Sequence, residues 1–409
     1  MKKIALFSTL LFLGLIGSQI LPSFLGDMLP TFSNVVGFFT MIGLSFIMIH
    51  VGYEFEIDKK RVKIYGWDYI VAMTAATFPW IFATAYFIFV LLPSEYWFSF
   101  TAWKEVILAG RFAAPTATGI LFSMLAAAGL SATWMFRKVR VLVIFDDLDT
   151  VLLMLPIKIL MVGIAWQLGV VVFTMVVLLL VAWYGLHRVS IPVSWPWVMM
   201  YSIIIAGVSE AIYWGTKIVD DRIPIHIEVL LPAFVLGCIM KRPAGSNPHC
   251  DDSKEGHQEG PESKSEQKVS TIVSAVFMIL VGLSMPLFIS AENVYSTSTT
   301  ITGQQPPLSA LTIVLHVLIL TLLINIGKMF PAVCYRKEAH WRERLALAVG
   351  MCPRGEVGAG IIILSLEYGI GGPIVTIAVL SLALNLLLTP VFVYIIINLI
   401  KLNPTNVKI

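Results

Sequence analysis

Apolar segments of about 17 to 25 residues recur along this chain, and each is long enough to cross a lipid bilayer as a helix. Of the 409 residues, 58% are hydrophobic and only 13% are charged, whereas about a quarter are charged in an average soluble protein. Backbone polar groups in lipid must be satisfied within the spanning segment, so we expect an all-α polytopic membrane protein. About twelve spans are predicted, at residues 4–25, 35–54, 64–92, 105–127, 140–163, 167–186, 196–214, 225–240, 269–290, 309–331, 344–367 and 372–399.

The distribution of basic residues predicts the orientation of these spans. Of the 28 Lys and Arg, three (Lys104, Lys217 and Arg222) lie between spans on one side, and four lie inside spans. The other 21 lie at the termini and in the alternate loops, so the positive-inside rule places both termini in the cytoplasm. The first segment is expected to be a span because no A-x-A cleavage pattern follows it. No basic run suggests a nucleic-acid partner.

One long segment, residues 242–268, is polar, of mixed charge and without large apolar side chains. Such a segment cannot bury a core, so we predict a disordered cytoplasmic linker. Its histidines, cysteine and aspartates match no known spacing of metal ligands, although a metal or pH sensor is the alternative.

Three aspartates interrupt the fifth predicted span, in the sequence VIFDDLDTV at residues 143–151. A charged residue at the centre of a spanning helix costs about 2.5 to 3.5 kcal/mol on insertion scales, so these side chains must face protein or water. Asp146 and Asp149 share a helix face, whereas Asp147 is turned about 100° away. The alternative is that the acids only stabilise the helix bundle by forming ion pairs with bases. The few bases inside spans would then leave at least one acid unpaired. We therefore predict a functional site.

The bases predicted inside spans are Arg111, Lys158, Lys328 and Arg354. Lys328 lies near the cytoplasmic end of the tenth span, at a depth similar to that of the aspartates, and is the natural partner for one of them. The alternative is that its long side chain reaches back to the cytoplasm. Lys158 lies near the outer end of the fifth span, and its side chain is expected to extend to the membrane surface at that end.

The fourth span contains residues that interrupt helices. In RFAAPTATGILF, residues 111–122, Pro115 and Gly119 lie around Thr116 and Thr118. A broken helix is allowed in lipid only where it is buried or lines a cavity, and its half-helix ends then offer dipoles and carbonyl oxygens to ions.

The eleventh span is also predicted to be broken, because MCPRGEVGAG at residues 351–360 combines Pro353 with three glycines. Its charged residues, Arg354 and Glu356, are expected to form a fixed structural pair. The fourth and eleventh spans are seven apart, and seven is odd, so they have opposite orientations. Inverted-topology repeats with two broken crossing helices are typical of secondary transporters.

Together, FDDLDT, the GK of the tenth span, APTATG and PRGEVG resemble the bacterial sodium/proton antiporters of the monovalent cation:proton antiporter superfamily, in its electrogenic two-aspartate branch. The resemblance covers nearly the whole chain. It implies that Asp147 is the principal cation ligand, that Asp146 pairs with Lys328, and that Thr116 and Thr118 lie beside the ion.

The familiar motif gives no role to the third acid, Asp149. We expect it to be a supporting residue held by Arg111, Arg354 or a hydroxyl group, so that it is not a third proton carrier. Arg354 and Glu356 are counted as supporting residues as well.

The resemblance also implies the organisation of the chain, residues 1–409, as one transporter domain. An ion-binding core, residues 64–163 and 309–400, would move against a dimer-forming scaffold, residues 4–54 and 196–290. The expected protein is a homodimer in the bacterial inner membrane that contributes to pH homeostasis. No cofactor is expected; Na⁺, possibly Li⁺, and H⁺ would be transported.

Charge competition suggests the mechanism, since two neighbouring carboxylates resist joint ionisation and protons then compete with a cation for the same oxygens. Three alternatives stay open: a K⁺/H⁺ antiporter, a potassium efflux channel of the same fold, and a Na⁺-coupled symporter of an organic anion. The channel would usually carry a nucleotide-binding G-x-G-x-x-G motif, which is absent, and the acids argue against an anion. An intramembrane enzyme is not expected, because there is no H-E-x-x-H or similar set.

Overall fold

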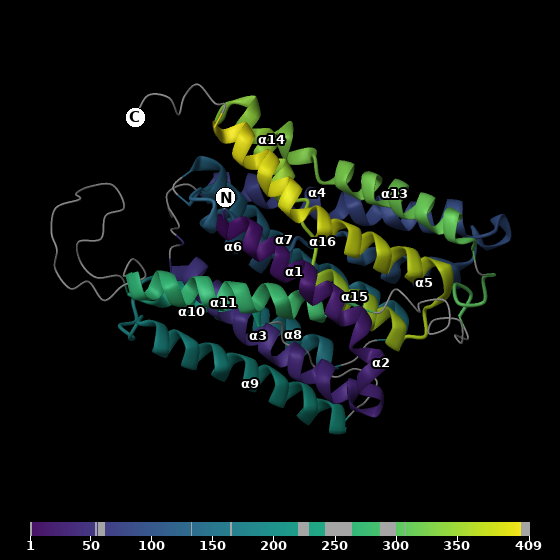
Figure 1. Ribbon diagram of the computed structural model, residues 1–409, viewed down its shortest axis with the longest axis horizontal. Coiled ribbons are helices and arrows are strands. Elements are labelled where there is room, and N and C mark those ends of the chain that lie inside the picture. The colour runs from purple at the N-terminus through teal and green to yellow at the C-terminus, as the bar shows by residue number, and fades with distance from the viewer. Residues whose placement is uncertain are drawn as a thin grey trace. The chain divides into compact units, whose positions relative to one another are not determined.

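The computed structural model describes residues 2–53, 55, 62–131, 133–163, 166–219, 229–241, 264–286, 300–306 and 308–401, and these are mostly helical (Figure 1). The helices are α1 (Lys2–Ile20), α2 (Pro22–Leu25), η1 (Gly26–Met28), α3 (Leu29–Tyr53), α4 (Val62–Tyr86), η3 (Phe87–Leu91), η4 (Ser94–Tyr96), α5 (Phe100–Gly110), η5 (Arg111–Ala113), α6 (Thr118–Ala127), α7 (Trp134–Val162), α8 (Trp166–Gly185), α9 (Trp195–Val219), α10 (Leu230–Ile239), α11 (Lys264–Leu283), α13 (Ala310–Gly327), η6 (Phe330–Ala332), α14 (Trp341–Gly350), α15 (Glu356–Glu367) and α16 (Gly372–Lys401).

The predicted fold class, an all-α polytopic membrane protein, is confirmed. Each predicted span overlaps one or more of these helices, and the described residues contain no strand beyond one isolated bridge between Val189 and Met240. Within the described chain, nine helical segments are long and apolar enough to cross a membrane. α7 is not one of the nine despite its 29 residues, because charged residues interrupt its apolar sequence.

Several helix ends differ from the predicted span ends, because hydropathy marks the lipid boundary and not the end of a helix. α7 begins at Trp134, six residues before the predicted span, and so includes its basic first turns. α11 begins at Lys264, which corrects the predicted linker: residues 264–268 are helical, with the acidic Glu266 in the first turn, where the helix dipole favours it. Residues 242–263 of that linker lie outside the described residues.

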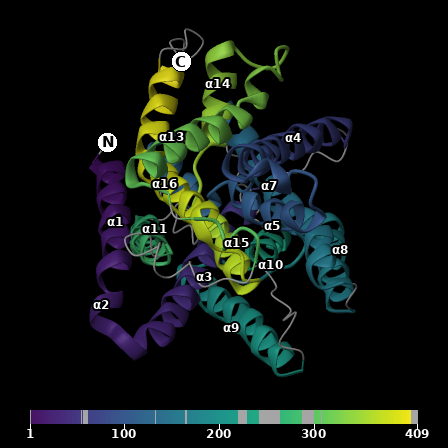
Figure 2. The same ribbon diagram turned by 90° about the vertical axis from the view of Figure 1, so that its right-hand side faces the viewer.

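The helices form two compact units by their packing. Unit 1 comprises Met1–Pro30, Lys60–Met161 and Val281–Ile409. Within unit 1, α13 packs along α4 and α16. α14 packs on α16 (Figure 2). α1 belongs to unit 1 by its packing, although its residues were predicted to be part of the scaffold. The division into a moving core and a scaffold concerns function, and it stays a prediction.

Unit 2 comprises Thr31–Lys59 and Val162–Leu280. Within it, α10 packs on α8 and α9. α3 and α10 approach each other closely at two glycines, since a Cβ atom at Gly52 would collide with the carbonyl oxygen of Phe234, and one at Gly237 with that of Ile49. Small residues allow such close backbone contact between helices in lipid, where packing replaces the hydrophobic effect.

The segments predicted as the fourth and eleventh spans each contain two helices in unit 1. After α5 and the 3-10 turn η5, residues 114–117 are not helical, and α6 follows. α14 and α15 are separated by residues 351–355. The two interruptions contact each other directly, because the backbone N–H of Ala117 donates to the carbonyl oxygen of Pro353 at 2.8 Å.

α13 ends at Gly327, where its backbone lies close to that of α4. A Cβ atom at Gly327 would lie 2.8 Å from the backbone nitrogen of Pro79. This contact is backbone against backbone, and neither helix can yield by rotating a side chain. The glycine of the GK pair therefore brings the next residue, Lys328, against the helix bundle.

We predict that Gly327→Ala lowers the melting temperature of the purified protein, although alanine is otherwise the better helix former by about 1 kcal/mol. Gly360→Ala is the matched control, because a Cβ atom at Gly360 in α15 would meet nothing within 4 Å. The control should be neutral or stabilising in thermal unfolding. Equal melting temperatures for the two variants would contradict the close approach.

Candidate ion-binding site

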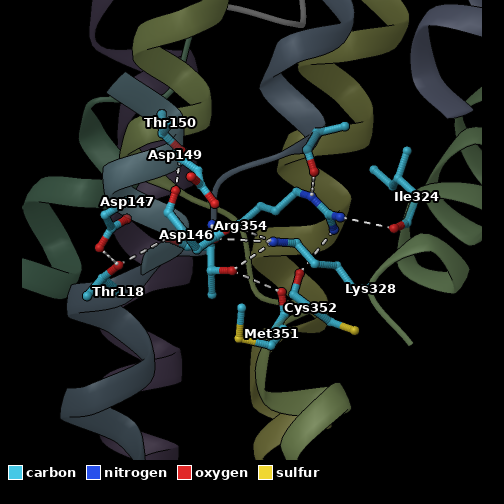
Figure 3. Close-up of polar contacts among 12 residues, drawn as sticks. Thr118, Asp146, Asp147, Asp149, Thr150, Ile324, Lys328, Met351, Cys352 and Arg354 are labelled. Atoms are coloured by element: carbon cyan, nitrogen blue, oxygen red, sulfur yellow. Dashed lines mark hydrogen bonds and ion pairs between the residues drawn. The ribbon is translucent and has the colours of Figure 1, made fainter. Parts of the chain in front are cut away.

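A buried ion pair joins α7 to the end of α13. The Nζ atom of Lys328 lies 3.2 Å from the carboxylate of Asp146, and both side chains are completely buried. In Figure 3 the two side chains point toward each other from different helices. The depth of Lys328 in the sequence suggested one of the aspartates as its partner, and the resemblance implied Asp146. The structure places Lys328 and Asp146 together.

The broken segment between η5 and α6 completes the surroundings of Asp146. The backbone N–H of Thr116 donates to Asp146 Oδ2 at 2.8 Å. Lys328 Nζ also donates to the hydroxyl of Thr116 at 3.0 Å, and this hydroxyl donates to the carbonyl oxygen of Met351 at 3.2 Å. Thr116 can bind the carboxylate with its backbone only because no helix uses that N–H group. Interrupting the helix is thus what makes the donor available.

Asp147 points away from this pair, as its position on the helix predicts (Figure 3). The hydroxyl of Thr118 donates to Asp147 Oδ2 at 2.8 Å, and the side chain of Asp147 is half-buried. Thr118 is the first residue of α6. Both acids of the pair therefore contact the same break in the chain, each through a different threonine.

Asp149 is 1% exposed and lies beside Arg111 and Tyr69. Arg111 Nη2 donates to the backbone carbonyl oxygen of Asp149 at 3.0 Å, while its guanidinium group lies 4.8 Å from the ring centre of Trp80. Tyr69 and Arg111 thus lie beside the third acid.

Arg354 is completely buried and donates hydrogen bonds to four segments of unit 1. Its Nε atom donates to the carbonyl oxygen of Ala113 at 2.8 Å, and Nη2 donates to that of Ile324 at 3.1 Å. Its Nη1 atom donates to Cys352 O at 3.1 Å and to the side-chain oxygens of Asn325 and Asn385 at 2.9 and 3.3 Å. Arg354 therefore connects both interrupted helices with α13 and α16.

Two other predictions concern Glu356 and Lys158. Glu356 begins α15, but its side chain lies outside the described part of the chain, so its predicted pairing with Arg354 does too. Lys158 is half-buried near the end of α7. The structure thus brings Asp146, Asp147 and Lys328 together with the two threonines, and places Lys158 three turns further along α7.

Sequence reasoning missed Tyr69, Asn325 and Asn385. The Nδ2 atom of Asn325 donates to Asn385 Oδ1 at 2.9 Å, and one turn away the hydroxyls of Thr321 and Ser381 are 2.8 Å apart. Asn325 precedes Lys328 by three residues, so the two residues share one face of the helix. That spacing was the available signal, because a polar stripe in an apolar helix faces protein.

The arrangement offers several oxygen atoms to a small hard cation. Carboxylate oxygens of Asp146 and Asp147 lie next to the hydroxyls of Thr116 and Thr118. Oxygen ligands of this kind are those that hard cations prefer. Among the described residues, no three His, Cys, Asp or Glu side chains converge to hold a metal ion.

A multi-pass helical membrane protein with paired acids and a lysine at two broken helices is arranged as an ion transporter. Residues 1–399 match the family described as sodium/hydrogen exchanger, transmembrane. The chain therefore belongs to this family of cation/proton antiporters.

The fold is similar to that of a solved transporter, the sodium proton antiporter MjNhaP1 from Methanocaldococcus jannaschii at pH 8. The TM-score is 0.55 with 14% sequence identity, and the match covers 94% of this chain and 89% of the other. No curated protein matches this chain significantly in sequence. The match to MjNhaP1 thus concerns the fold.

We predict that Lys328→Met destabilises the protein, by about 3 to 5 kcal/mol if it leaves the Asp146 carboxylate charged and buried without its partner. The double variant Lys328→Met/Asp146→Asn should regain much of this loss, because the remaining amide is neutral. Thermal unfolding of the purified proteins measures both. A double variant no more stable than the single one would argue against a stabilising ion pair.

Proposed function

We propose that this protein exchanges Na⁺, and also Li⁺, for protons across the bacterial inner membrane, with Asp146 and Asp147 as the shared binding site. The observation that carries the proposal is the contact of both acids with one break in the chain, where Asp146 also binds Lys328. The membership of the sodium/hydrogen exchanger family supports it. Asp147 is the principal cation ligand in this scheme.

Competition for the same carboxylate oxygens produces the exchange. A cation that binds Asp147 and reaches Asp146 competes with Lys328, which lies 3.2 Å from that carboxylate. A proton on either acid competes with the cation in turn. The two carboxylates together are less negative when they hold a cation or protons than when the site is empty. If only loaded sites change their access across the membrane, one ion can return only after the other has left.

The proposed moving core comprises residues 64–163 and 309–400, with residues 4–54 and 196–290 as scaffold of a homodimer. All the site residues above belong to the core. Both termini face the cytoplasm in this proposal, as the distribution of Lys and Arg indicates. Crosslinking of the purified protein in lipid tests the dimer.

Two protons for one cation would make the exchange electrogenic. If Asp146 and Asp147 each release a proton while one Na⁺ is carried, one net charge crosses the membrane in each cycle. The membrane potential then contributes about 2.3 kcal/mol for each charge at 100 mV. Asp149 stays a supporting residue in this scheme, because it lies beside Tyr69 and Arg111 and faces away from Asp147 on the helix.

The decisive experiment follows a pH gradient in proteoliposomes while Na⁺, Li⁺ and K⁺ are added in turn. Na⁺ and Li⁺ should collapse the gradient and K⁺ should not. A response to K⁺ alone would favour a K⁺/H⁺ antiporter. Potassium efflux that needs no counter-ion would favour a channel. A gradient that collapses only when an organic anion is added with Na⁺ would favour a symporter.

Asp147→Asn should abolish Na⁺-driven proton movement, because it removes the charge that binds the cation and keeps the shape of the side chain. Thr118→Val should weaken apparent Na⁺ affinity by a smaller amount, since it removes one hydroxyl beside the site. Both are measured in proteoliposomes at equal protein content. Exchange that persists in Asp147→Asn would contradict the assignment of the cation ligand.

Asp149→Asn should alter stability or apparent affinity but leave exchange dependent on the membrane potential. The potential is imposed with K⁺ and valinomycin once K⁺ has been excluded as a substrate. Unmodified protein that ignores the potential would refute the two-proton scheme. Loss of the potential dependence in Asp149→Asn alone would show that the third acid carries charge.

A further inference from the structure

A second group of buried charges lies in unit 1 and has no part in the exchange scheme. Lys138 Nζ in α7 lies 2.9 Å from Asp68 Oδ1 in α4 and 3.1 Å from Glu338 Oε2. Asp68 is 1% exposed and Lys138 is 9% exposed. A buried ion pair is costly to desolvate unless further hydrogen bonds complete it, so its retention calls for a reason.

Tyr335 completes this group from the segment that follows α13. Its hydroxyl donates to Asp68 Oδ1 at 2.7 Å, and the Lys138 ammonium lies 4.4 Å from the centre of its ring. The side chain of Tyr335 is buried. Burial, with the carboxylate of Asp68 next in effect, raises the pKa of Tyr335, so the hydroxyl keeps its proton and remains a donor.

The backbone of Tyr335 has a φ of 53°, in the left-handed region. A bulky residue is rare there, and the conformation costs on the order of 1 kcal/mol, which glycine would avoid. Glycine offers neither a ring for Lys138 nor a hydroxyl for Asp68. The side chain of Tyr335 thus offsets a strain that its own backbone introduces.

This group of side chains connects the two chain segments that carry the ion pair of Lys328 and Asp146. Tyr335 follows Lys328 by seven residues, and Lys138 precedes Asp146 by eight residues in α7, which is about 12 Å along the helix. Between Lys328 and Tyr335 the chain forms the short turn η6, and Arg344 Nη1 binds this segment at Ala332 O and Cys334 O. The backbone after Lys328 has little freedom as long as Tyr335 is held.

We propose that Tyr335 is a positioning residue for exchange. Tyr335 binds Asp68 of α4, which is itself bound by Lys138 of α7, and so fixes the segment that carries Lys328 with respect to Asp146. The proposal rests on the proposed function, in which Lys328 competes with the cation. A fixed lysine backbone keeps the ammonium group at Asp146 whenever the cation is absent. Tyr335 therefore sets the strength of the competitor that an arriving cation displaces.

Tyr335→Phe in the full-length protein tests this, because it removes one hydroxyl and keeps the ring on Lys138. Because Lys328 would then be held less firmly as a competitor, the KM for Na⁺ should fall about threefold or more. This change is smaller than the full effect of one hydrogen bond to a charged group. The maximal rate should stay within about twofold, since no ligand is lost. Asp68→Asn should also lower the KM for Na⁺. The double variant Tyr335→Phe/Asp68→Asn should have nearly the same KM as each single variant.

Tyr394→Phe is the matched control, because this tyrosine of α16 is 53% exposed. Its KM should equal that of the unmodified protein. A fall in melting temperature of Tyr335→Phe without a change in KM would make the group a structural anchor only and overturn the proposal. An unmodified protein without Na⁺/H⁺ exchange would overturn the proposed function and, with it, the positioning role.

Discussion

The contact between Lys328 and Asp146 is the interaction on which the rest of the core depends. Two opposite charges with no exposed surface, 3.2 Å apart, are stable in a membrane protein only when donors and acceptors around them are arranged in advance. Gly327 lets α13 approach α4 at Pro79, which brings the lysine in, and the interrupted helix supplies the N–H group of Thr116 to the carboxylate. The helix break and the glycine are thus requirements of the ion pair.

Breaking two helices at one place creates a second requirement, because the carbonyl oxygens near each break lose their intrahelical donors. Arg354 meets it. A planar guanidinium group has five N–H donors, and this one reaches carbonyl oxygens of Ala113, Cys352 and Ile324. An arginine in the PRGEVG motif is therefore explained by backbone carbonyls, whereas the sequence suggested an ion pair with Glu356. Lysine has three donors on one atom and could not reach three segments at once.

Hydropathy alone was sufficient to locate the helices, because lipid imposes both their length and their composition. That Lys328 pairs with one of the aspartates was accessible too, since equal depth in the membrane is a one-dimensional property, whereas the choice of Asp146 came from the resemblance. Contacts that depend on how helices cross were not accessible. Nothing in the spacing of Asp68, Lys138 and Tyr335 shows that they are in contact. The left-handed backbone at Tyr335 could not be predicted either, because tyrosine normally avoids that conformation. Asn325, one turn before Lys328 on the same helix face, was within reach of a periodicity argument.

The two adjacent acids differ in their surroundings, and this difference gives a physical reason for having both. Asp146 is completely buried and accepts hydrogen bonds from the Thr116 backbone and from Lys328. Asp147, about 100° around the helix, is half-buried and accepts one from the hydroxyl of Thr118. A cation that approaches Asp147 loses less of its hydration before it gains a charged ligand, whereas reaching Asp146 requires it to compete with a fixed ammonium group. In the proposed scheme Asp147 thus suits capture and Asp146 suits coupling, because a cation that reaches Asp146 displaces Lys328 at the end of α13. A single carboxylate in the position of Asp147 would bind a cation without displacing a lysine. A single carboxylate in the position of Asp146 would bind its lysine but would lack the more accessible acid that first receives the cation.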